Sequence, residues 1–162
     1  MGTSWRVDET YIKLKGKWVY LYRGVDQEGQ TIDFFLSEHR DIAAAKHFLQ
    51  RAIAKCGVPQ KITLDGYAAS HVAVGELQAE GILPATLLVR TNRYLNNMIE
   101  QDHRRVKQRV NPMLGFKRFA HAAIMLSGIE VVHQIKKNQF DLSALCTPNA
   151  RPPHVWESVL AA

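Results

Sequence analysis

The chain has 162 residues and a mass of 18.4 kDa, the size of one ordinary domain. Apolar residues make up 46% of the sequence and charged residues 22%, which excludes a disordered or low-complexity chain. No apolar run approaches the roughly 18 residues of a membrane span, and the first five residues do not resemble a signal peptide. The two cysteines are too few for a disulfide framework or a four-ligand zinc site. These features predict a soluble, cytoplasmic protein.

The net charge of +6 is concentrated in one stretch of the chain. Residues 90–118 hold eight basic side chains against two acids, whereas the rest of the sequence holds 13 of each sign. A local excess of this kind is typical of a strip that binds a polyanion on an otherwise balanced domain. A solvated basic helix face is the alternative that composition alone leaves open.

The first third of the chain predicts three strands, over 5–12, 17–25 and 31–36, because it is rich in aromatic and β-branched residues. Short glycine-containing turns at 14–16 and 26–29 have the length of hairpin loops and favour an antiparallel meander. A helix is predicted next, with Asp41 as its N-cap, apolar positions at helical spacing up to residue 53, and Gly57 and Pro59 as stop signals.

The remaining pattern predicts a strand over 61–64, a helix over 71–80, a strand over 86–90 and two helices over 95–111 and 117–138. The order of elements indicates an α/β fold with a five-stranded mixed sheet flanked by helices, in which the antiparallel meander is extended by two parallel strands. The predicted domain spans 4–140, and 141–162 is expected to be a tail.

Three acids stand in positions that suggest a common site. Asp8 lies inside the first strand, where an unpaired buried carboxylate would be costly. Asp65 ends the fourth strand, at the edge where open α/β sheets usually bind ligands, although an Asp-Gly pair is also ordinary turn chemistry. Glu100 belongs to the helix over 95–111 and, as an alternative, forms a surface salt bridge with Arg104.

Helical geometry places polar and charged residues beside the apolar stripe of that helix. Ile99 and Val106 belong to the stripe, and the flank beside it presents Asn96, Glu100, Arg104 and Lys107. Four further side chains, two on this helix and two on the first strands, receive other interpretations. We expect Asp102 to be structural, His103 to be a hydrogen-bonded packing residue, Glu9 on the opposite pleat to be a weaker candidate than Asp8, and Trp18 to pack on its strand rather than stack on a base.

Read together, the acids suggest phosphoryl-transfer chemistry. Two divalent ions about 3.5–4 Å apart can activate a hydroxyl and stabilise a leaving oxygen, and Mg²⁺ prefers carboxylate oxygens. Three acids from two strands and a helix are sufficient ligands. The residues predicted to bind DNA lie on the same helix as Glu100: Asn96, Asn97, Arg104, Arg105 and Lys107.

Five stretches of the chain are familiar in this order: WRVDETYIKLKGKWVYLYRGVD, DFFLSEHRD, KITLDGYAAS, RYLNNMIEQDHRRVKQR and PMLGFKRF. Together they resemble the catalytic domain of bacterial DDE insertion-sequence transposases, in particular insertion-sequence family six, whose members have a retroviral-integrase-like core. The 34 residues between Asp65 and Glu100, and the basic Lys107 seven residues later, are typical of that superfamily. The resemblance extends from about Ser4 to Phe140.

The resemblance implies an RNase H-like fold in which Asp8, Asp65 and Glu100 bind two Mg²⁺ ions, with Mn²⁺ able to substitute. It implies a bacterial, nucleoid-associated enzyme that hydrolyses transposon ends, joins the freed 3′-hydroxyls to target DNA and works as a homo-oligomer, expected to be a dimer. Lys107 would contact the transposon end. Two features depart from the family: an upstream helix-turn-helix segment is not seen here, and Gly66 replaces a lysine that some relatives carry.

Two other functions remain open at this point. A non-catalytic DNA-binding or assembly fragment of a truncated transposase would keep the fold and the basic strip without turnover. An RNase H-type nuclease would act on an RNA–DNA hybrid in preference to duplex DNA.

Overall fold

The computed structural model describes residues 2–91, 97–113 and 115–140. The expected tail at 141–162, and the predicted first two residues of the third helix, lie outside the described residues. The elements, in chain order, are β1 (Ser4–Leu14), β2 (Lys17–Asp26), β3 (Thr31–Ser37), α1 (Ile42–Cys56), β4 (Lys61–Leu64), α2 (Ala68–Ala79), β5 (Leu88–Thr91), α3 (Asn97–Val110), η1 (Asn111–Met113) and α4 (Phe119–Lys136).

The sheet has five strands in the order β3-β2-β1-β4-β5, which confirms the predicted mixed sheet. β1, β2 and β3 pair antiparallel, and β4 and β5 continue the sheet in parallel from β1. The β1–β2 hairpin closes through Lys15 and Gly16, both of which have positive φ (49° and 79°). Such a two-residue turn has the twist that a tight hairpin needs, and glycine adopts it without a steric penalty.

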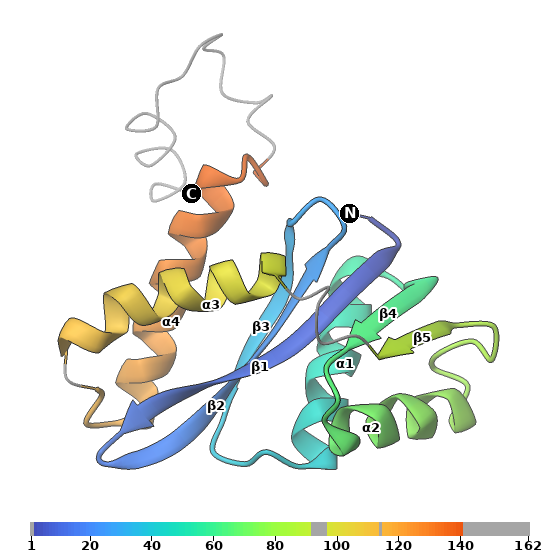
Figure 1. Cartoon of the computed structure of the whole chain (residues 1–162), viewed down its shortest axis with the longest axis horizontal. Helices are drawn as coiled ribbons and strands as arrows, with labels where there is room; N and C mark the ends of the chain where they lie inside the picture. The colour runs from blue at the N-terminus through green and yellow to red at the C-terminus, as the bar shows by residue number, and fades with distance from the viewer. Residues whose placement is uncertain (1, 92–96, 114, 141–162) are drawn as a thin grey trace, which may run out of the picture.

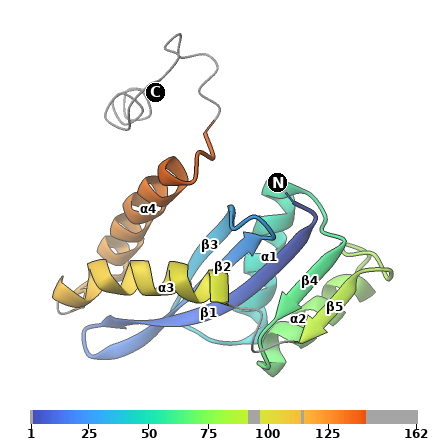
Figure 2. The ribbon, with the colours of Figure 1, turned by 45° about the horizontal axis from the view of Figure 1, so that its top comes forward.

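Two helical layers cover the sheet (Figures 1 and 2). Strand alternation sends Val7 and Tyr22 into a core with α1 and α2, and sends Ile12 and Leu21 into a second core with α3 and α4. Within the described residues, no helix is both long enough and apolar enough to cross a membrane.

The structure shifts several predicted boundaries by one to three residues. α2 begins at Ala68 rather than at residue 71, because Ala68 and Ala69 are good helix formers directly after the turn at Asp65. β5 runs from Leu88 to Thr91 at one edge of the sheet, and all four of its residues are exposed. α4 is shorter than predicted at both ends, beginning at Phe119 and ending at Lys136.

A buried cation joins the sheet to the second helical layer. The Arg23 side chain of β2 is 0% exposed and forms ion pairs with Asp102 of α3, at 3.2 Å between Nη1 and Oδ2, and with Glu130 of α4. Lys137, just after α4, also donates to Asp102. Burial lowers the pKa of Arg23 to about 10, which still leaves it charged at neutral pH. Asp102 is therefore structural, as expected.

We predict that Arg23→Met lowers the free energy of unfolding by about 3–5 kcal/mol, because Glu130 would be left as a buried charge without a lysine or arginine partner among the described residues and Asp102 would keep only Lys137 and Arg105. Urea unfolding followed by circular dichroism measures the difference. Lys46→Ala is the control, since Lys46 pairs with Glu76 and Glu80 at the surface and its loss should change stability little. Equal, small effects of the two substitutions would contradict this role for Arg23.

Candidate active site

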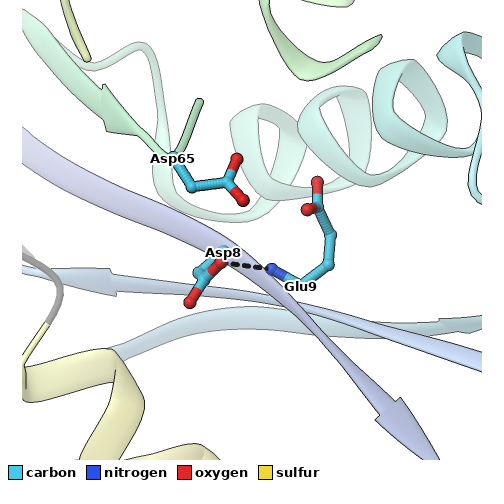
Figure 3. Close-up of side chains that lie close together, drawn as sticks. All are labelled: Asp8, Glu9 and Asp65. Carbon is cyan, nitrogen blue, oxygen red and sulfur yellow. Dashed lines mark hydrogen bonds between the residues drawn. The ribbon is translucent and has the colours of Figure 1, made fainter. Parts of the chain in front are cut away.

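Parallel pairing of β1 with β4 brings two of the three predicted acids together. Val7 pairs with Leu64 at the end of the ladder, so the next residues along the two strands, Asp8 and Asp65, are neighbours. One carboxylate oxygen each from Asp8, Glu9 and Asp65 lies within 4.8 Å of the other two (Figure 3). The third member, Glu9, is the residue that strand alternation made a weaker candidate.

Glu9 does leave β1 on the pleat opposite to Asp8. Its Oε1 accepts a 2.6 Å hydrogen bond from the Ser70 hydroxyl on α2, and its Oε2 accepts a 3.2 Å bond from Arg40, which precedes α1. The carboxylate nevertheless belongs to the cluster, because Asp65 lies on the same side of β1 as the Glu9 side chain and an oxygen of Asp8 turns back to the Glu9 backbone N–H (Figure 3). Burial raises the pKa of Glu9, and the hydrogen bonds from Ser70 and Arg40 act against that rise, so the two donors compensate part of its negative charge.

Asp8 lacks such compensation. Burial, and after it the nearby Asp65 carboxylate, raise its pKa to about 7. Its hydrogen bond comes from the Glu9 backbone N–H, at 2.9 Å. Across the described residues, no lysine or arginine lies within 4.0 Å of the Asp8 carboxylate, and the nearest base is His103, with Nδ1 at 3.7 Å from Oδ2.

His103 cannot neutralise Asp8 at physiological pH. Burial lowers its pKa to about 3, and the positive charges of Arg23 and Lys107 act in the same direction, so the imidazole is neutral. The side chain is buried, as expected for a packing residue, but its Nε2 has no hydrogen-bond partner in the described part of the chain. His103 is thus a neutral side chain that lines the site beside Asp8.

Asp65 combines turn chemistry with a place in the site. Its Oδ1 accepts a 3.0 Å hydrogen bond from the backbone N–H of Tyr67, which closes the turn after β4. Its Oδ2 lies 3.8 Å from Nη2 of Arg40 and remains partly exposed. Asp65 can therefore serve the turn and the site at once, because Oδ1 is used by the turn and Oδ2 faces Arg40.

Glu100 lies on α3, across a hollow from Asp8. It is exposed, and it does not belong to the group of carboxylates within 4.8 Å of one another. The alternative salt bridge with Arg104 is not found among the ion pairs of the described residues, which on α3 involve Asp102 and His103. The hollow has a volume of about 500 Å³ and is lined by Asp8, Glu9, Thr10, Glu100, His103, Arg104, Lys107, Gln108 and Asn111.

The predicted DNA-binding residues divide between two sides of α3. Arg104 and Lys107 line the hollow with Glu100, whereas Arg105 lies on the other flank, 3.8 Å from Asp102, and lines a separate hollow with Arg109 and Lys137. Asn97 begins α3, but its side chain lies outside the described residues, as does all of Asn96.

Arg40 is a site residue that the sequence pattern did not reveal. Its guanidinium carbon lies 3.7 Å from the ring centroid of Tyr67, and the same group contacts Glu9 and Asp65. It occupies the loop before the N-cap Asp41, where no helical or strand periodicity applies. The aromatic ring and the carboxylates hold the Arg40 side chain beside the cluster.

The donor set fits a hard divalent cation. Carboxylate oxygens are the ligands that Mg²⁺ prefers, and a buried acid without a cationic partner is stabilised as an anion when a metal ion binds to it. Asp8 and Asp65 offer such oxygens, and Glu100 offers a third across the hollow that Asp8 lines.

The fold is that of retroviral integrase cores, an RNase H-like α/β fold. The catalytic core domain of HTLV-2 integrase, solved in complex with magnesium in a trimeric form, superposes with a TM-score of 0.57 at 19% identity, covering 70% of this chain and 73% of that one. The core of BIV integrase superposes with a TM-score of 0.53 at 13% identity, covering 69% and 71%.

The sequence matches the DDE domain family model over residues 2–139. It is 42% identical over 141 residues to transposases of Staphylococcus aureus, one for the insertion sequence-like element IS431mec and one for IS257 in transposon Tn4003. These matches cover 86% of this chain and 61% of the relatives, so the chain spans about three fifths of their length. An uncharacterized protein of Yersinia pseudotuberculosis, pYV0051, is 35% identical over 82 residues, covering 49% of this chain and 77% of that protein.

These findings define the chain first as an integrase-like DDE domain. It belongs to the DDE transposases of bacterial insertion sequences, within insertion-sequence family six. The resemblance identified from the five sequence stretches is confirmed.

We predict that Asp8→Asn raises the melting temperature of the metal-free protein at pH 8, with a gain on the order of 1–2 kcal/mol, because the amide removes a buried charge beside Asp65. The gain should shrink at pH 5, where the native Asp8 carboxyl is mostly protonated. Thermal unfolding in EDTA measures it.

Glu9→Gln is the matched comparison. Its gain should be smaller, because the Glu9 carboxylate is already bound by Arg40 and Ser70. An Asp8→Asn protein that melts below the wild type at pH 8 would refute the uncompensated charge.

Proposed function

We propose that this chain is the metal-dependent catalytic domain of a transposase, a polynucleotidyl transferase that hydrolyses DNA at the ends of an insertion sequence and transfers the freed 3′-hydroxyls to target DNA. The observation that carries the proposal is the proximity of the Asp8 and Asp65 carboxylates, with Asp8 facing Glu100 across a hollow that Arg104 and Lys107 also line. Membership of the DDE family supports it.

Asp8, Asp65 and Glu100 are the residues that would hold the metal. When bound, two Mg²⁺ ions would supply Lewis acidity and activate the attacking water or hydroxyl, and Mn²⁺ should serve in their place. The carboxylates come from two neighbouring strands and one helix, so their backbones are held by the sheet ladder and by the packing of α3.

The other residues of the site act on the substrate and on the acids. Lys107 and Arg104 would bind phosphates of the strand that enters the hollow, since both line it on the side of Glu100. Arg40 and Ser70 bind both oxygens of Glu9, so this carboxylate is already engaged by donors although it lies close to Asp8 and Asp65. Neutral His103 adds a wall without adding charge next to Asp8.

The active assembly would be a homo-oligomer on DNA. This proposal rests on the relatives: the HTLV-2 integrase core is described in trimeric and dimeric forms, and the staphylococcal proteins are transposases. Recognition of the element's ends by a helix-turn-helix segment belongs to the same proposal, because the relatives are longer than this chain.

Nicking of supercoiled plasmid DNA in Mn²⁺ tests the proposed chemistry. Wild-type protein should convert supercoiled to relaxed circles, and Asp65→Asn should reduce the rate at least roughly 100-fold, because it removes a metal ligand charge. Gel analysis of a time course gives the rates. Asp41→Asn is the control, since asparagine caps a helix about as well as aspartate and Asp41 caps α1.

Each other outcome contradicts the proposal. Equal nicking by wild type and Asp65→Asn removes the catalytic claim. Binding of DNA without nicking in either protein favours the non-catalytic DNA-binding fragment. Faster cleavage of an RNA–DNA hybrid than of duplex DNA favours the RNase H-type nuclease.

A further inference from the structure

Two large aromatic side chains lie exposed beyond the acids, Tyr11 on β1 and Trp18 at the start of β2. Tyr11 is 46% exposed and Trp18 is 59% exposed, and their ring centroids are 6.2 Å apart in an edge-to-face arrangement. Neither ring belongs to the two cores of buried residues. β4 pairs with β1 only over Ser4 to Val7, and among the described residues the backbone of Phe116 bonds this edge only at Lys13 and Lys15, so Tyr11 lies in the stretch between the two.

A hollow of about 220 Å³ separates these rings from the last turns of α3. Val106 and Val110 of α3 contribute apolar surface to it, and Lys107 and Asn111 contribute a cation and an amide. Lys107 and Asn111 also line the hollow that contains Asp8 and Glu100. The aromatic hollow is therefore the continuation of the candidate active site along the edge of β1.

The chemistry of this hollow suits a planar ring attached to a phosphate. Aromatic faces and aliphatic groups stack on the faces of a base, and an amide can bond with its polar edge. The cation lies on the side toward the acids, where the phosphate of the same strand would be. An apolar peptide or a second copy of the chain would explain the rings, but it would not need Lys107 between the two hollows.

We propose that the Tyr11–Trp18 hollow binds an unpaired nucleobase of the DNA strand whose phosphate lies at the Asp8–Asp65 site. The location of the phosphate rests on the function proposed above. The base must be unpaired because neighbouring bases cover both faces of a stacked base in duplex DNA. Lys107 then contacts the phosphate next to that base, and the strand bends out of the duplex at the point of reaction.

DNA binding without turnover tests the proposal. Wild-type protein is titrated, in Ca²⁺, with three duplexes of one sequence: fully paired, with one unpaired thymine, and with an abasic site at the same position. Fluorescence anisotropy gives the dissociation constants. The wild type should prefer the unpaired thymine over the abasic site by roughly 5- to 100-fold, the range expected for stacking of one base.

Trp18→Ala should abolish that preference while leaving the affinity for fully paired DNA unchanged, and Trp18→Phe should restore most of it. Ile124→Ala is the control, because Ile124 is 68% exposed on α4, away from the hollow, and its loss should leave the preference intact. The exposure of Trp18 means that both variants should fold, and circular dichroism verifies this.

Three results would overturn the proposal. Trp18→Ala could weaken all three duplexes equally, which indicates a general strand contact. It could leave the thymine preference unchanged. It could shift the protein from dimer to monomer in sedimentation without changing the preference, which makes the hollow an interface between copies. Since no turnover is involved, the result is independent of the nicking of plasmid by wild type and Asp65→Asn.

Discussion

Arg23 brings a full positive charge into the interior between the sheet and the helices α3 and α4, and the surrounding chain must neutralise it there. Asp102 and Glu130 do so from two different helices, and this ties both helices to β2. Arg23 is also the cross-strand partner of Asp8. The ion pair with Asp102 therefore holds α3, and with it Glu100 two residues earlier, over the strand that carries the first acid.

The acids of the site differ in how their charges are compensated. Glu9 is bound on both oxygens by Arg40 and Ser70, whereas Asp8 is buried beside Asp65 and a neutral imidazole. The native fold tolerates the unfavourable burial of the Asp8 carboxylate because two apolar cores, one on each face of the sheet, stabilise the surrounding structure. A site that is unfavourable by itself and favourable with a divalent cation is one in which metal binding and stability are coupled.

Periodicity and turn signals were sufficient to predict the sheet, since alternation along β1 to β3 and the parallel crossovers leave few possible topologies. The strand positions of Asp8 and Asp65 were also predictable, whereas their proximity was inferred from spacing and from the family resemblance and follows here from the pairing of β1 with β4. The proximity of the Glu9 carboxylate to Asp8 and Asp65 could not be predicted. Alternation gives the face of the sheet on which a side chain lies, but not how far the side chain reaches. Arg40 lies in a loop without periodicity, and its place depends on the fold of α1 and the turn at Tyr67.

The most direct test of the account is a crystal structure of the protein soaked with Mn²⁺, with the ions located by anomalous scattering. The account predicts manganese bound by Asp8 and Asp65, with an oxygen of Glu100 within about 2.5 Å of an ion. Manganese held by Asp8, Glu9 and Asp65 with Glu100 remote, or no manganese at the acids at all, would contradict it.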